Sequence, residues 1–125
     1  MTNPFKDQKD FMEACDQTVT GDGLNFEQYG MYLKLIQEEG AELADAIKDN
    51  DLVEQLDALL DIIVVSIGAM NSLGVDAEGA WNEVMRTNMA KIDPETGMVR
   101  KREDGKVLKP DGWTAPDLRK FVENN

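Results

Sequence analysis

Residues 52–67 read LVEQLDALLDIIVVSI and decide the fold. The stretch passes from a carboxylate-rich half into an almost wholly apolar half with no helix breaker before Gly68, so it predicts one long buried helix. The apolar positions that recur at helical spacing define its expected inward stripe, namely Leu56, Leu59, Leu60, Ile63 and Ile67. Asp57 and Asp61 stack beside this stripe, and Glu54 lies on the same flank. Carboxylates beside a core are costly to bury unless a positive group meets them.

A second acidic seam occupies residues 32–47, which read YLKLIQEEGAELADAI. Its seam positions follow the spacing i, i+4, i+7 and i+11, and they are Leu35, Glu39, Glu42 and Ala46. Because only residues 49–51 connect the two segments, the helices are expected to pack antiparallel. Glu39 and Glu42 can then face Glu54 and Asp57 across the seam. The sequence therefore predicts four carboxylates at one site.

Length, charge and residue usage limit the possible classes of protein. The 125 residues are expected to form a single domain, 1–125. A net charge of -12 disfavours nonspecific binding to nucleic acid or to an anionic membrane, so a nucleotide would have to bind together with cations. With Cys15 as the single cysteine and no histidine, disulfide frameworks, Cys/His zinc sites and Ser-His triads are excluded. The absence of a signal-like start and of a long apolar run leads us to expect a cytoplasmic protein.

The helix signals predict an all-α, four-helix-bundle-like fold. Asn3 and Pro4 open a first helix that ends near Gln17, and Asn25 caps the second. The expected helices cover about residues 4–17, 26–48, 51–73 and 77–92, with Gly74 ending the third and Pro94 following the fourth. Gly40, inside the second helix, indicates either close backbone approach or simple tolerance.

Beyond Pro94 the helical periodicity is lost, and Asp104-Gly105 predicts a turn between two extended arms of a short β-hairpin. This hairpin collects most of the clustered basic residues, which are Arg100, Lys101, Arg102, Lys106 and Lys109. It is either a phosphate-binding arm or a solvated decoration. Trp113 and the amphipathic turn at residues 118–122 are expected to pack against a helix or a second subunit.

An oxygen-only cluster suits hard cations, so the acidic seams indicate Mg²⁺, with Mn²⁺ as a substitute. Di-iron bundles also use facing carboxylates, but their Glu-x-x-His elements require histidine, which this chain lacks. Several aromatic and amide side chains are candidates to stack on or hydrogen-bond to a nucleobase, without indicating which base: Trp81, Trp113, Phe26, Asn25 and Asn88.

Three motifs resemble those of a known family: LIQEEGAEL at 35–43, EQLDALLD at 54–61 and NMAK at 88–91. They are similar to the Glu-x-x-Glu, Glu-x-x-Asp and Asn-x-x-Lys elements of the MazG-like all-α nucleoside triphosphate pyrophosphohydrolases, which are related to phosphoribosyl-ATP pyrophosphohydrolase and the dimeric dUTPases. The resemblance covers about residues 26–118. The tail KREDGKVLKP at 101–110 resembles that of small single-domain members from phages and bacteria.

The resemblance implies a role for each matching residue. Mg²⁺ would be bound by Glu39, Glu42, Glu54 and Asp57. Asn88 and Lys91 would contact the nucleotide, although Lys91 could also be an ordinary surface charge. Glu38 and Asp61 are additional acids, either of which could orient the attacking water, so the predicted catalytic residues are Glu38, Glu39 and Asp61. The predicted substrate-binding residues are Asn88, Lys91, Arg100, Arg102, Lys106 and Trp81.

The predicted function is Mg²⁺-dependent hydrolysis of a nucleoside triphosphate, such as the dNTP dGTP, to the monophosphate and pyrophosphate. Two alternatives stay open: phosphoribosyl-ATP or a non-canonical dNTP as substrate, or a non-enzymatic helical module that pairs its acidic seam with a basic partner. Long apolar helices in so small a chain, together with the resemblance, also predict a homo-oligomer, either a dimer or a tetramer. No nucleic-acid or membrane partner is expected, and the location is the cytoplasm of a bacterial cell or of a phage-infected host.

Overall fold

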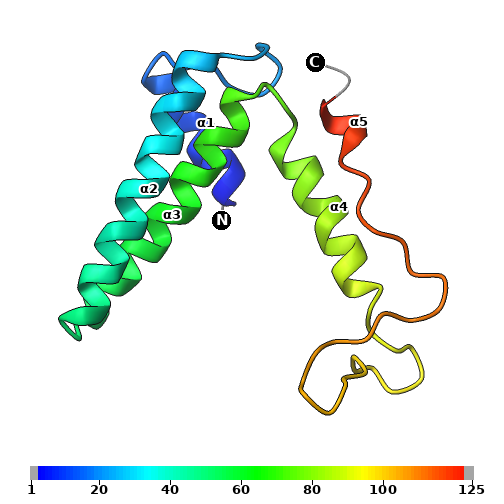
Figure 1. Cartoon of the computed structure of the whole chain (residues 1–125). Helices are drawn as coiled ribbons and strands as arrows, with labels where there is room; N and C mark the ends of the chain where they lie inside the picture. Colours follow the sequence, from blue (N-terminus) through cyan, green and yellow to red (C-terminus); the bar gives the residue numbers. More distant parts are fainter. Residues whose placement is uncertain (1–2, 123–125) are drawn as a thin grey trace. The chain divides into compact units, whose positions relative to one another are not determined.

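The computed structural model describes residues 3–122, which divide into two compact units, residues 3–77 and 78–122. The elements in chain order are α1 (Pro4–Ala14), α2 (Phe26–Lys48), α3 (Leu52–Ser72), α4 (Ala77–Met89) and the short α5 (Arg119–Val122) (Figure 1). The all-α prediction is confirmed. The single domain and the four-helix bundle stay predictions. No single helix among the described residues is long and apolar enough to cross a bilayer.

The helices begin where the capping residues predict. The Asn3 side chain accepts a hydrogen bond from the Lys6 backbone N–H (2.8 Å), and the Asn25 side chain accepts one from Gln28 (3.0 Å). Asp51 caps α3 in the same way.

Two helix ends differ from the prediction. α1 stops at Ala14 because Asp16 adopts a left-handed backbone conformation (φ 58°). α4 stops at Met89, and the next residues continue as tight i→i+3 turns, with Lys91 N–H bonded to Asn88 and Ile92 N–H to Met89.

In the first unit, α2 and α3 form an antiparallel hairpin and lie side by side along most of their length (Figure 1). The three connecting residues turn tightly because Asn50 has a positive φ of 53°, a conformation that asparagine tolerates. α1 packs against α3. The expected antiparallel arrangement is therefore confirmed.

The core of this unit gathers Met12 of α1, Tyr32 of α2, and Val65 and Ala69 of α3, together with Val19 of the loop. It lies where α2 begins and α3 ends, and Tyr29, Leu35 and Ile36 pack against it. The buried face of α3 consists mainly of small residues, which are Ala58, Val65, Ile67, Gly68, Ala69, Asn71 and Ser72.

Most of the stripe that the periodicity placed inward is left uncovered by the other helices of the first unit. Ile67 is buried, but Leu56, Leu59, Leu60 and Ile63 are each about half exposed. The physical reason is that α2 packs against the small-residue face of α3, where two backbones can approach closely. Helical periodicity identifies an apolar face but does not say which neighbour covers it.

Gly68 is the point of closest approach between the two long helices. A Cβ atom at this position would lie 2.3 Å from the Tyr32 ring, much closer than real carbon contacts. Tyr32 is buried, and its hydroxyl donates a hydrogen bond to the Gln17 side chain, so the ring has little room to move. Gly40 is different, since a Cβ there meets nothing within 4 Å. The tolerance interpretation of Gly40 fits the structure better than close backbone approach.

These two glycines give a matched stability test. We expect Gly68→Ala to lower the free energy of unfolding by roughly 1–3 kcal/mol through overpacking against Tyr32. Gly40→Ala should raise it by about 0.5–1 kcal/mol, because alanine favours the helix and meets no neighbour. Urea unfolding of both variants measures the difference. A loss of stability in Gly40→Ala would show that something does approach that position.

In the second unit, two hydrogen bonds tie the tail to α4. The Trp113 Nε1–H donates to the Thr87 backbone carbonyl (2.7 Å), and the Asp117 backbone N–H donates to the Glu83 carboxylate (2.7 Å). Arg86 also donates two hydrogen bonds to Glu83, at 2.8 and 3.0 Å. Arg86 and the Asp117 N–H together lower the pKa of Glu83 to about 2. The expectation that Trp113 packs the tail onto a helix is confirmed.

The predicted β-hairpin is wrong as a pair of strands. Within residues 3–122, extended pairing is limited to two isolated antiparallel bridges, Ile92 with Val99 and Lys101 with Val107. The turn itself is where it was expected, since Gly105 has a φ of 88° and Arg102 N–H bonds to the Lys106 carbonyl. A lone two-stranded ribbon with exposed, charged arms has too little apolar contact to extend its ladder.

Candidate functional site

Glu39, near the middle of α2, is the most electrostatically unusual residue of the first unit. One of its carboxylate oxygens, Oε2, is shielded from solvent and has no hydrogen-bond partner. Buried polar atoms are nearly always paired, and an unpaired carboxylate oxygen is especially costly. Such an atom indicates a group that is built to receive a partner.

The surroundings of Glu39 are themselves acidic. Burial raises its pKa to about 7, and a side-chain hydrogen bond with Glu42 and the charges of Asp61, Glu42 and Asp57 contribute further. Acidic residues of both α2 and α3 thus act on Glu39. The four-carboxylate site that the sequence predicts stays a prediction.

The register of the hairpin decides which of these acids lie opposite one another. Because α2 ends at Lys48 and α3 begins at Leu52, residues that are equally distant from Asn50 face each other. The Tyr32 and Gly68 contact follows this rule, and the Gln55 side chain bonds to the Ala46 carbonyl at 3.3 Å, within one residue of it.

Under this register Glu39 faces Asp61 and Glu42 lies opposite Ala58, next to Asp57, whereas Glu54 lies opposite Ala46, nearer the turn. Glu54 lies in the exposed first turn of α3, where its backbone N–H bonds to the Asp51 cap, and it is not among the charges that act on Glu39. Glu38 is an exposed residue of α2. Asp61 acts on Glu39 together with Glu42 and Asp57. Exposure does not separate these acids, because Glu42 and Asp57 are as exposed as Glu38 and Glu54.

The four carboxylates suit a hard divalent cation. They offer only oxygen ligands, the preferred donors for Mg²⁺ and Mn²⁺, and Glu39 contributes a buried oxygen that lacks a partner. Across residues 3–122, no three acidic, histidine or cysteine side chains are gathered closely enough to ligate one ion as they stand. Carboxylates repel one another, so a positive ion is needed to draw them together. The donor types therefore suit a hard cation, while the described side chains as placed do not form a set of ligands around one point.

The second unit holds the predicted nucleotide-binding residues. The Lys91 ammonium donates to the Asn88 Oδ1 at 3.2 Å, so the Asn-x-x-Lys motif forms a local pair between the last turn of α4 and the residues that follow it. Trp81, on α4, is about half exposed.

The basic residues of the tail do not form one uniform patch. Arg102 is bound to Asp104 by two hydrogen bonds, the shorter one 2.6 Å, which offsets its charge. The Lys106 backbone N–H bonds to the same aspartate. Arg100 is exposed and pairs with Leu108 through its backbone carbonyl.

Sequence reasoning missed the grouping of Lys109 with Lys91. Their ammonium nitrogens lie 4.6 and 5.3 Å from the centroid of the Trp113 ring, respectively. Eighteen residues separate the two lysines, so no short motif connects them. The available signal was a tryptophan near the end of a polar tail, which indicates a contact but does not name its partners.

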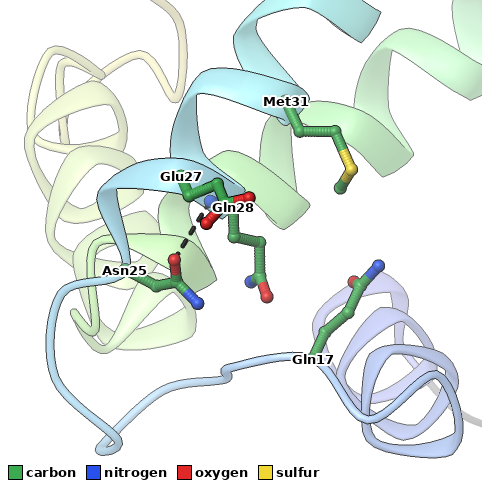
Figure 2. A pocket seen from close by; sticks show the side chains of 5 residues that line it. All are labelled: Gln17, Asn25, Glu27, Gln28 and Met31. Atoms are coloured by element: carbon green, nitrogen blue, oxygen red, sulfur yellow. Dashed lines mark hydrogen bonds between the residues drawn. The ribbon is translucent and has the colours of Figure 1, made fainter.

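A pocket of about 400 Å³ also opens in the first unit, where α1, the following loop and α2 meet. Its lining consists of Gln17, Asn25, Glu27, Gln28 and Met31 (Figure 2). The Gln28 amide is fully engaged with Thr18 and Ser72, so it holds the loop against α3. By the rise of an α-helix, Gln28 lies roughly 16 Å along α2 from Glu39. This pocket is thus separate from the carboxylate cluster.

An all-α fold with acidic residues on two antiparallel helices is typical of the all-α nucleotide pyrophosphohydrolases. A family model described as "Phosphoribosyl-ATP pyrophosphohydrolase" matches residues 9–88, well over half of the chain, and the chain belongs to this family within the MazG-like superfamily. The matched range includes the whole carboxylate cluster and Asn88 but ends before Lys91 and the tail. Membership indicates pyrophosphohydrolase activity on a nucleotide substrate. A search of the curated proteins finds no match.

The raised pKa of Glu39 predicts a pH-dependent stability effect. Above pH 7 its carboxylate is charged in both states, so folding bears the full cost of burying that charge; below about pH 4.5 the group is neutral in both states and the cost vanishes. We therefore expect Glu39→Gln to raise the melting temperature in EDTA at pH 8 and to lose this advantage below pH 4.5. Thermal unfolding across this pH range provides the measurement.

With added Mg²⁺, the wild type should have a higher melting temperature than Glu39→Gln. A cation that binds Glu39 stabilises the wild type by mass action and stabilises Glu39→Gln less. Equal stabilisation of both proteins by Mg²⁺ would contradict a cation site at Glu39.

Proposed function

We propose that this chain hydrolyses a nucleoside triphosphate, such as the dNTP dGTP, to the monophosphate and pyrophosphate, with Mg²⁺ or Mn²⁺ as cofactor. The observation that carries this proposal is the unpaired, buried Glu39 carboxylate oxygen among Glu42, Asp57 and Asp61. Such a cluster is costly in a protein that does not use it. The family membership supports the reaction type.

Glu39, Glu42 and Asp57 would hold the cation. The resemblance adds Glu54 as a ligand, whereas the register favours Asp61. When bound, Mg²⁺ would offset the charge of the triphosphate and act as a Lewis acid on its phosphoryl oxygens. The carboxylates would hold the cation in place, and the reaction needs no covalent intermediate on the protein.

A water molecule would attack the α-phosphorus and displace pyrophosphate. Its oxygen forms the new bond to phosphorus, the bond between the α-phosphorus and the bridging oxygen breaks, and a carboxylate accepts the proton of the water. Asp61 is the better candidate for this proton transfer, because it faces Glu39, whereas Glu38 is exposed. Lys91, with Asn88, would contact the nucleotide, and Arg100, Arg102, Lys106 and Trp81 are further candidates from the sequence.

The activity test is a panel of all dNTPs and NTPs, with phosphoribosyl-ATP and oxidised dNTPs, in the presence of Mg²⁺. The products must be resolved as monophosphate plus pyrophosphate, rather than diphosphate plus phosphate. We expect turnover with at least one nucleotide and none in EDTA. If none of these nucleotides is hydrolysed and Mg²⁺ does not stabilise the fold, the helical interaction module becomes the better interpretation.

Variants of single carboxylates test the assignment of ligands. Glu39→Gln, Glu42→Gln and Asp57→Asn should each reduce kcat by about 100-fold or more, as the loss of transition-state electrostatics does elsewhere. Asp61→Asn and Glu54→Gln are the informative pair. The register favours the larger loss of kcat for Asp61→Asn. A larger loss for Glu54→Gln would support the set of ligands that the resemblance implies.

We also propose that the chain forms a homo-oligomer and acts in the cytoplasm. The exposed apolar stripe of α3, comprising Leu52, Leu56, Leu59, Leu60 and Ile63, supports a second copy as its cover. Light scattering should give a multiple of 14.0 kDa, and Leu60→Glu should reduce that mass, whereas the polar control Lys48→Glu should not. A monodisperse wild-type monomer at micromolar concentration would contradict the oligomer.

A further inference from the structure

The indole of Trp113 holds two ammonium groups in the second unit. The Lys109 Nζ lies 4.6 Å and the Lys91 Nζ 5.3 Å from the ring centroid, both within the range of cation–π attraction. One ring thus brings together a lysine from just past α4 and a lysine from the tail. Two like charges on one aromatic ring repel each other, which is a cost unless an anion binds between or beside them.

The ring is fixed rather than mobile. Its Nε1–H donates to the carbonyl of Thr87, a residue that is only 2% exposed, at 2.7 Å. Four residues further on, the Asp117 N–H is bound by Glu83, which Arg86 holds in place. The tail is therefore anchored to α4 on the C-terminal side of the lysine pair.

Neither lysine has its charge met by an acid. Within the described part of the chain, the ion pairs involve other basic residues, and neither Lys91 nor Lys109 lies in one. The Lys91 ammonium donates one hydrogen bond to the neutral Asn88 Oδ1. An ammonium has three donors, so most of the donors of the pair are left for a ligand. This is notable in a protein with 25 acidic residues and a net charge of -12.

We propose that Lys91 and Lys109 form a phosphate-binding pair and that Trp113 is the positioning residue that holds them together. The ligand is the pyrophosphate portion of the triphosphate, a compact and highly charged anion that can accept hydrogen bonds from both ammonium groups. This assignment of the ligand rests on the proposed function. A nucleic acid is a poorer fit, because the remaining surface is acidic and would repel a long polyanion.

The first test uses the full-length protein and inorganic pyrophosphate, with calorimetry in EDTA so that no divalent ion takes part. Lys109→Ala should weaken binding about tenfold, the size expected for one charge-assisted hydrogen bond, while Lys109→Arg should restore most of it. The matched control is Lys120→Ala, which removes a lysine that also lies over an aromatic ring, that of Phe121 at 5.4 Å. Equal binding by Lys109→Ala and Lys120→Ala would overturn the proposal.

Trp113 needs variants that separate positioning from folding. Trp113→Phe keeps an aromatic face but removes the N–H donor, and Trp113→Leu removes both. If the ring positions the lysines, binding should fall in the order wild type, Phe, Leu, with the helical circular dichroism unchanged. If Trp113→Leu fails to fold, the comparison of Trp113→Phe and Lys109→Arg with wild type still decides. Wild-type affinity in Trp113→Phe together with unchanged affinity in Lys109→Ala would remove the proposed site.

Kinetics distinguish failure of this site from failure of the proposed function. If nucleotides are hydrolysed and Lys109→Ala leaves KM unchanged, the function stands and the site is wrong. If no nucleotide is hydrolysed but Lys109→Ala loses pyrophosphate binding, the site stands and the function is wrong. If both hold, Lys109→Ala should raise KM more than it lowers kcat, because this contact is made in both the ground state and the transition state.

Discussion

The register of the α2–α3 hairpin is the constraint on which the first unit depends. Gly68 lets the Tyr32 ring lie against the backbone of α3, and the short turn at Asn50 fixes which residues face each other. Seven residues along from that contact on each helix, the same register places Glu39 opposite Asp61. A slip of one helical turn would separate these two carboxylates and would also drive the Tyr32 ring against a residue with a side chain. The register therefore determines both the packing of the two helices and the electrostatic surroundings of Glu39.

This register brings negative charges near Glu39, which lowers the stability of the fold and is not needed for the two helices to pack. Burial and three neighbouring carboxylates together raise the pKa of Glu39 to about 7. A core built only for stability would place an apolar residue there, since an unpaired buried charge destabilises the native state. The rest of the unit compensates with a well-satisfied network, in which the Gln28 amide joins the loop after α1 to Ser72 at the end of α3.

The second unit brings positively charged side chains together. They do not lie along one helix; they come together because the tail folds back on α4 through hydrogen bonds of Trp113 and of Glu83. Aromatic attraction lets two lysines lie near each other without acidic partners, which would otherwise cancel the positive potential. The acidic residues of the first unit and the lysine pair of the second unit therefore differ in the kind of ligand that they suit, a cation and a phosphate group, respectively.

The sequence by itself determined the all-α class, the starts of α1, α2 and α3 and the end of α3, because caps, proline and glycine act within a few residues of their own position. It also determined that Glu39, Glu42 and Asp57 lie on two helices that the short connection makes antiparallel. Only the tertiary structure decided that Asp61 lies opposite Glu39, since that depends on register, and that α2 packs against the small residues of α3 rather than against the Leu56 stripe. It also decided that Lys91 and Lys109 meet on Trp113, because contacts between residues far apart in sequence depend on how the chain folds back and leave no local pattern.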